Sequence, residues 1–234
     1  MRILRLFPAL VPLLASGACI PYATGATAVT APPGELVPST SVYFIPGGLE
    51  RLTTDSAGGS YFGIDSEFRI GIDERSDLGM RAAGWVGLTM DYKHRMDGRP
   101  GNDGPALSYL VGAGVVNAGE HGLLQGALLA SGRPTRQDGA PGVTPYGGLK
   151  VMHVIPLVEE AVSDDPTAGV FAGVRIGTRD LAISPEVAVF YDRSALGLRD
   201  RNWIVVPSFT FHGDELMRRL FGSRPVPLPP PGWP

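Results

Sequence analysis

Nine charged residues are the first candidates for chemistry. Each of them lies on the polar parity of a segment in which apolar and polar residues alternate. Successive side chains of a strand point to opposite faces, so these charges lie on the face opposite the apolar residues. Enclosed opposite charges would pair across strands, since an unpaired buried charge is costly. The pattern indicates an ionic network filling a narrow barrel, or else the lining of a polar conduit or small-ligand site. We expect the filled interior. The residues are Asp65, Glu67, Arg69, Arg81, Asp91, Lys93, Lys150, Arg175 and Glu186.

Cys19 is the second candidate, as a site of lipid modification. It is the only cysteine, so no intramolecular disulfide can form. It follows two early arginines, an apolar run and the small residues Ser16-Gly17-Ala18, which together are typical of a cleaved export signal. We expect residues 1–18 to be a signal peptide and Cys19 to become the acylated first residue. The lipobox is imperfect, because Ser16 stands where it usually has Leu; the alternative is an ordinary signal peptide with a cysteine near its cut.

The histidines give no indication of catalysis. His94, His121, His153 and His212 fall in turns or near strand ends, and none belongs to a recognisable sequence pairing with Ser or Asp. Neither G-x-S-x-G nor H-E-x-x-H occurs. One cysteine and scattered histidines do not predict a metal site. We therefore expect no catalytic residues, no cofactor and no enzyme.

The elements that must position these residues are strands. With 32 glycines, 22 prolines, 18% charged and 44% hydrophobic residues, the composition favours many strands broken by turns. The clearest alternation runs from Tyr61 to Ile72, with Phe62, Ile64, Phe68 and Ile70 on one parity. Similar segments predict strands near residues 35–45, 61–72, 77–83, 86–93, 105–116, 122–130, 143–155, 169–177, 181–191 and 201–211.

About ten strands, an even number, are typical of a bacterial membrane barrel. Past the N-terminus there is no apolar run of about 18 residues, so a membrane would have to be crossed by a closed barrel. The sequence thus predicts an all-β, antiparallel up-and-down transmembrane β-barrel. We expect a signal peptide over 1–18, a lipobox cysteine and linker over 19–33, the barrel over 34–212, and a short helix with a Pro-rich tail over 213–234.

A family resemblance agrees with this architecture. Cys19, YATGATAVTAPPGEL, FRIGIDERSDLGMR and VGLTMDYKHRM occur in an order that resembles a family of bacterial outer-membrane β-barrel lipoproteins. The resemblance covers residues 19–96, and beyond them only the rhythm of the strands agrees. That family has no defined biochemical function, so the resemblance implies a fold and a location but no activity.

Function is expected to be structural or adhesive, in an outer-membrane barrel whose lumen is plugged by charged side chains. The alternatives are a small-solute pore, an outer-membrane hydrolase or acyltransferase acting on lipid A, and a soluble barrel that binds an apolar ligand. The expected partners are membrane lipid, the barrel-assembly machinery and the lipoprotein-sorting machinery. A net charge of −3 and the lack of a recognisable motif exclude nucleic acid.

Overall fold

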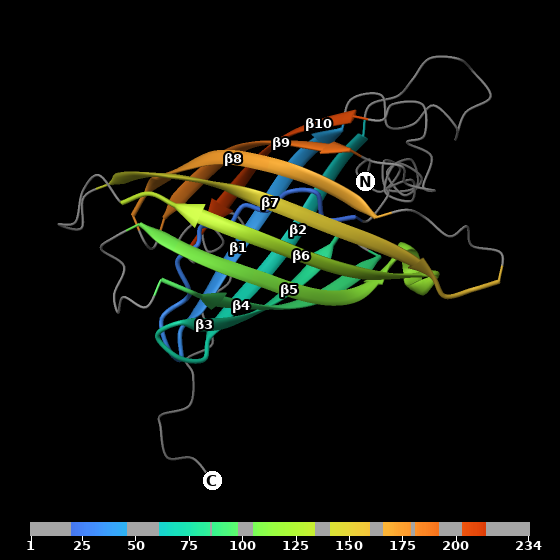
Figure 1. Cartoon of the computed structure of the whole chain (residues 1–234), viewed down its shortest axis with the longest axis horizontal. Coiled ribbons are helices and arrows are strands. Elements are labelled where there is room, and N and C mark those ends of the chain that lie inside the picture. The colour runs from blue at the N-terminus through green and yellow to red at the C-terminus, as the bar shows by residue number, and fades with distance from the viewer. Residues whose placement is uncertain are drawn as a thin grey trace, which may run out of the picture.

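The computed structural model describes residues 20–45, 61–84, 86–97, 105–133, 141–159, 166–178, 181–191 and 203–213. They form one all-β unit with ten strands in the order of the chain (Figure 1). The strands are β1 (Leu36–Ile45), β2 (Tyr61–Gly71), β3 (Ser76–Ala83), β4 (Gly87–Arg95), β5 (Ala106–Val116), β6 (His121–Ser131), β7 (Gly142–Pro156), β8 (Thr167–Gly177), β9 (Ala182–Tyr191) and β10 (Trp203–His212).

Each strand pairs antiparallel with its neighbours in sequence, and β1 pairs with β10 to close the barrel. The predicted closed, antiparallel up-and-down barrel is confirmed. Short turns fix the register where they are described: between β2 and β3 the N–H of Arg75 donates to the Asp73 carboxylate at 2.7 Å. This bond lowers the pKa of the Asp73 carboxyl. No helix among the described residues is long and apolar enough to cross a membrane.

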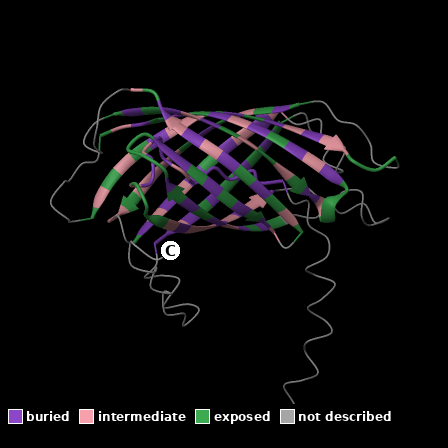
Figure 2. Cartoon of the chain, turned by 90° about the horizontal axis from the view of Figure 1, so that it is seen from below, coloured by how far each residue is buried: buried purple, intermediate pink, exposed green. Residues whose placement is uncertain are grey.

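The two faces of the barrel wall differ in chemistry, as the alternation predicts. Phe62, Ile64, Met90 and Leu124 point outward and are 67%, 52%, 56% and 49% exposed, so the outside carries large apolar side chains. Exposed and buried residues alternate along the strands (Figure 2). The strand β6 is apolar on both parities, so alternation alone does not assign its faces. In the structure Leu124 lies outside, whereas Leu123 is buried inside.

Residues 20–33 run through the interior of the barrel, where the sequence indicated a linker outside it. Their small side chains let an extended chain pass between the walls, and Tyr22, Ala23 and Ala28 are fully buried. Figure 1 shows this dark blue segment between the strands. Small, polar, Pro-ended segments are typical of tethers. Here, however, backbone groups of the segment form hydrogen bonds to buried side chains of the barrel wall. We call residues 20–33 the threaded segment.

The threaded segment passes from one end of the barrel to the other. We call the end where β1 begins and β10 finishes the proximal end, and the opposite end the distal end. Ile20 lies at the distal end, where its carbonyl accepts a 3.0 Å hydrogen bond from the hydroxyl of Tyr43, near the finish of β1. Pro33 bridges to Gly71 at the proximal end. The chain then turns at Gly34 and enters β1.

Each end of the barrel has both short and long connections. The distal end has the long connections over 46–60, 157–166 and 192–202, but also the short ones over 84–86 and 117–120. The proximal end has short turns over 72–75 and 178–181, together with longer connections over 96–105 and 132–141. Cys19, the predicted signal peptide over 1–18 and the predicted tail from residue 214 lie outside the described residues.

Candidate functional site

A cluster of ion pairs on β2, β3 and β4 occupies the proximal half of the lumen. Arg69 lies at its centre, with Nη1 2.5 Å from Glu67 Oε1 and Nη2 2.6 Å from Asp77 Oδ1 and 2.7 Å from Asp91 Oδ1. Arg81 donates from Nη2 to Glu67 Oε2 at 2.6 Å. The cluster forms because the register places Glu67 opposite Arg81 and lets long side chains of three adjacent strands meet.

Eight of the nine predicted charged residues are buried, and Arg175 on β8 is half-buried. Asp77 is fully buried and central to the cluster, since Lys93 Nζ lies 3.2 Å from its Oδ2. It is absent from the predicted set, although it lies on the same parity as Arg81. Asp65 lies at the margin, with Oδ2 4.0 Å from Arg81 and Oδ1 accepting the N–H of Gly84.

The charged side chains also hold the threaded segment, which the sequence did not reveal. Arg81 donates from Nη1 to the carbonyl of Ala23 at 2.6 Å and from Nη2 to that of Thr24 at 3.2 Å. Lys93 Nζ donates to the carbonyl of Val29 at 2.7 Å. Each of these two cations therefore binds both a carboxylate of the barrel wall and a carbonyl of the threaded segment.

Two predicted charges lie apart from the cluster and bind the segment directly. On β9, Glu186 accepts the N–H of Thr24 and the N–H of Gly25, one on each carboxylate oxygen and both at 2.9 Å. On β7, Lys150 donates to the carbonyls of Pro21, Tyr22 and Ala23. Together with Arg81 and Lys93, these two residues place charged side chains around the extended threaded segment.

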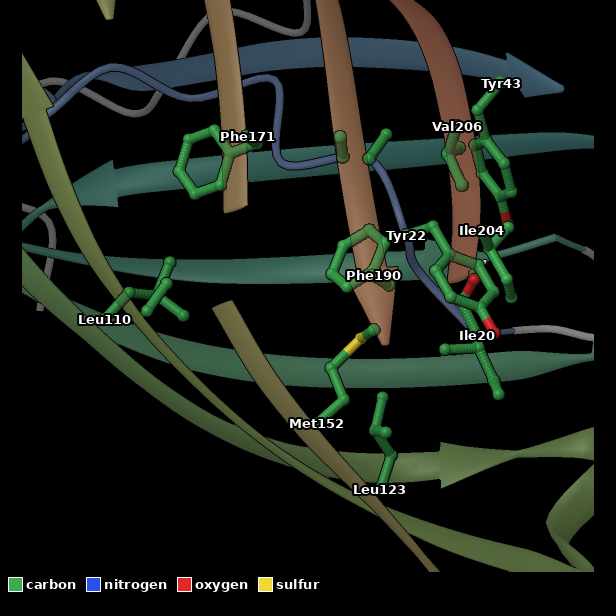
Figure 3. Close-up of a cluster of buried hydrophobic side chains, with 14 of the residues drawn as sticks. Ile20, Tyr22, Tyr43, Leu110, Leu123, Met152, Phe171, Phe190, Ile204 and Val206 are labelled. Carbon is green, nitrogen blue, oxygen red and sulfur yellow. Dashed lines mark hydrogen bonds between the residues drawn. The ribbon is translucent and has the colours of Figure 1, made fainter. Parts of the chain in front are cut away.

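A second part of the lumen is an apolar cluster, which differs from the mainly ionic interior that the sequence predicted. The ring of Tyr22 packs edge-on against Phe190 at 5.3 Å and against Tyr43 at 6.5 Å between ring centroids. Figure 3 shows these rings with side chains from β6, β7 and β10. The sequence missed this part because Leu123 and Met152, both buried here, come from segments that are apolar on both parities.

Two histidines have serine partners in space, although no sequence motif pairs them. His94 Nδ1 lies 2.9 Å from Ser76 Oγ on the outer parity, and His212 Nε2 lies 2.8 Å from Ser184 Oγ inside the lumen. Both serines are covered: Ser76 is 2% exposed and Ser184 is 0% exposed, so neither hydroxyl is open to a substrate. Pairing of neighbouring strands brings each serine next to its histidine, so no short sequence motif predicts the contact.

The arrangement holds an extended polypeptide through its backbone. Among the described residues, no group of three or more His, Cys, Asp or Glu side chains is placed to hold a metal. The lumen instead presents cations to carbonyls and carboxylates to N–H groups.

Comparisons with known proteins give structural matches only. No protein-family model and no curated protein matches the sequence. The N-terminal β-barrel domain of Pseudomonas aeruginosa OprF matches at a TM-score of 0.30 and 9% identity, over 76% of this chain and 98% of that one. Ail of Yersinia pestis, in complex with the heparin analogue sucrose octasulfate, matches at 0.25 and 9% identity, over 76% of this chain and 96% of that one. The resemblance in residues 19–96 stays a prediction.

Proposed function

We propose that the protein is an outer-membrane β-barrel whose lumen is sealed by its own N-terminal segment and whose role is structural or surface-interacting. The observation that carries the proposal is the reversed polarity of the wall. Large apolar side chains such as Phe62 and Met90 face outward, while charges such as Arg69 and Asp77 are buried inside. A barrel in lipid needs an apolar outside and tolerates a polar interior. A soluble barrel that binds an apolar ligand would require the opposite.

The threaded segment favours a sealed barrel over a small-solute pore. It extends from Ile20 at the distal end to Pro33 at the proximal end, and Tyr22, Ala23 and Ala28 within it are fully buried. A solute would have to displace a chain that many charge-assisted hydrogen bonds hold. The covered serines give no support to a hydrolase or acyltransferase. We therefore propose a role without catalysis.

Arginine at an outward position tests the location. Met90 lies in the middle of β4 and is 56% exposed on the outer face. If this face lies in lipid, Met90→Arg should reduce the stability of the barrel in bilayers by about 2–4 kcal/mol, the cost of arginine near the midplane. The measurement is equilibrium unfolding of the protein reconstituted in lipid vesicles.

Leu181→Arg is the matched control for Met90→Arg. Leu181 lies in the turn before β9 and is 43% exposed, at the rim of the barrel. Arginine near the membrane interface costs only about 0–1 kcal/mol. Equal, small losses for both variants would show that the outer face is not in lipid.

Lipidation of Cys19 is a separate part of the proposal. Ile20, the next residue, lies at the distal mouth, so acyl chains on Cys19 would have to reach the membrane from that mouth. Mass spectrometry of the mature protein should find an N-terminal Cys19 that carries acyl chains. Cleavage at another bond, or an unmodified Cys19, would contradict this. Cys19→Ser should still insert, because acyl chains only add an anchor to the barrel.

A further inference from the structure

The wall recognises the threaded segment through its main chain. Carbonyls of the segment accept hydrogen bonds from wall side chains, and its N–H groups donate to wall carboxylates. Ser108 Oγ donates to the carbonyl of Ala28 at 3.0 Å, and the N–H of Ala31 donates to Asp77 Oδ2 at 2.8 Å. The pattern continues along the segment at the carbonyls of Ile20, Pro21, Tyr22, Ala23, Thr24, Thr27 and Val29 and at the N–H groups of Thr24 and Gly25.

Side chains of the segment contribute little to this recognition. The hydroxyl of Thr24 is buried without a hydrogen-bond partner, although its backbone N–H and carbonyl are both bound. The largest exception is Tyr22, whose ring packs against Phe190 and Tyr43. In addition, the hydroxyl of Thr30 donates to the carbonyl of Glu74 at 3.3 Å, and the side chain of Ile20 is buried. The lumen thus selects an extended backbone, one aromatic ring and small side chains after it.

The segment is held as a ligand is held, and not as a strand of the barrel. The ladder of β1 to β10 closes without it, and among the described residues its one pairing with a strand is the bridge from Pro33 to Gly71. Its connection to β1 runs through Gly34, which has a φ of +73° and no neighbouring atom within 4 Å of a Cβ built there. The covalent link is therefore at an open site outside the lumen.

We propose that the lumen is a peptide-binding channel that residues 20–33 occupy as a tethered ligand. A second extended peptide, with one aromatic residue followed by small residues, can take their place. The channel offers Lys150, Arg81 and Lys93 to the carbonyls of such a peptide and Glu186 and Asp77 to its N–H groups. This binding activity goes beyond the proposed function and does not depend on the membrane location.

A cut at the tether tests the proposal on the full chain. A site for a specific protease is inserted between Gly34 and Glu35, and the folded protein is cut in detergent. The probe is a fluorescent synthetic peptide of residues 20–33, and its anisotropy reports binding. We expect the cut barrel to stay folded and to take up the peptide saturably, with competition by unlabelled peptide. The uncut chain should take up little, because a tether keeps the resident segment at a high effective concentration.

Two modified peptides distinguish backbone recognition from simple apolar uptake. Methylation of the Gly25 nitrogen removes one donor to Glu186 and should weaken binding at least tenfold, because a charge-assisted bond is lost. A Thr24→Ser peptide keeps every backbone group and should bind as the original does. Equal binding of both peptides would overturn the proposal. So would a folded cut barrel that takes up no peptide, or a barrel that unfolds when it is cut.

A second variant keeps the proposal testable if the inserted site prevents folding. Tyr22→Ala in the intact chain removes the aromatic anchor from the tethered segment and leaves the channel wall unchanged. The labelled peptide, which retains Tyr22, should bind this variant at least tenfold more tightly than it binds the unmodified chain. Equal uptake by the two chains would contradict the channel.

Discussion

Arg81→Gln is expected to destabilise the barrel by about 3–5 kcal/mol, the cost of breaking a buried ion pair by removing one partner. Arg81 is 4% exposed and is the partner of Glu67 Oε2 at 2.6 Å, so the change removes the cation from one oxygen of a buried carboxylate, while Arg69 keeps the other oxygen. It also removes the donors to the carbonyls of Ala23 and Thr24. The free energy of unfolding, from denaturant titration of the folded barrel, measures the effect.

Glu67→Gln in the Arg81→Gln background separates the loss of the ion pair with Glu67 from the loss of the hydrogen bonds to the threaded segment. Neutralising the carboxylate should recover much of the lost free energy of unfolding. The part that comes from the hydrogen bonds to the carbonyls of the segment should stay lost. Arg69 keeps Asp77 and Asp91 in this double variant, so it is not left alone. A single Arg81→Gln variant as stable as the original chain would show that water solvates these charges, and would favour a conduit.

Gly25→Val is expected to cost about 2–5 kcal/mol, from left-handed backbone strain and from overpacking. Gly25 has a φ of +60°, and a Cβ built on it would lie 2.2 Å from the hydroxyl oxygen of Thr210 on β10. The segment must therefore shift, and the bond from the Gly25 N–H to Glu186 is disturbed with it. Thermal and denaturant unfolding measure the loss.

Gly34→Val is the matched control, because it carries the backbone strain without the collision. Its φ is +73° and no atom lies within 4 Å of a Cβ built there. We expect a loss of about 1–2 kcal/mol, from the left-handed conformation alone. Equal losses at Gly25 and Gly34 would mean that residue 25 is not held against the barrel wall.

The sequence predicts the barrel well because alternation is a local signal. Phe62 and Ile64 on one parity, with Asp65 and Glu67 on the other, determine which face each side chain takes, and the structure confirms it. The ten segments expected from this rhythm correspond to the ten strands. Where both parities are apolar, as around Leu123 and Leu124, the alternation is silent, and only closure of the barrel assigns the faces.

The position of residues 20–33 could not be predicted in the same way. Nothing in a run of Ala, Thr and Gly distinguishes a solvated tether from a chain held inside a barrel. The difference lies in distant partners: Glu186 is separated from Thr24 by 162 positions, and Lys150 from Pro21 by 129. The charges were recognisable by parity, but the carbonyls and N–H groups that they bind become apparent only when the barrel closes.

Conductance across a planar lipid bilayer tests most directly whether the barrel is sealed by its own N-terminal segment. The full chain is inserted into the bilayer, and protection of the strands from added protease confirms insertion. We predict no conductance steps from the inserted chain, because residues 20–33 fill the lumen. Stable open channels from the inserted, unmodified full chain would contradict the account.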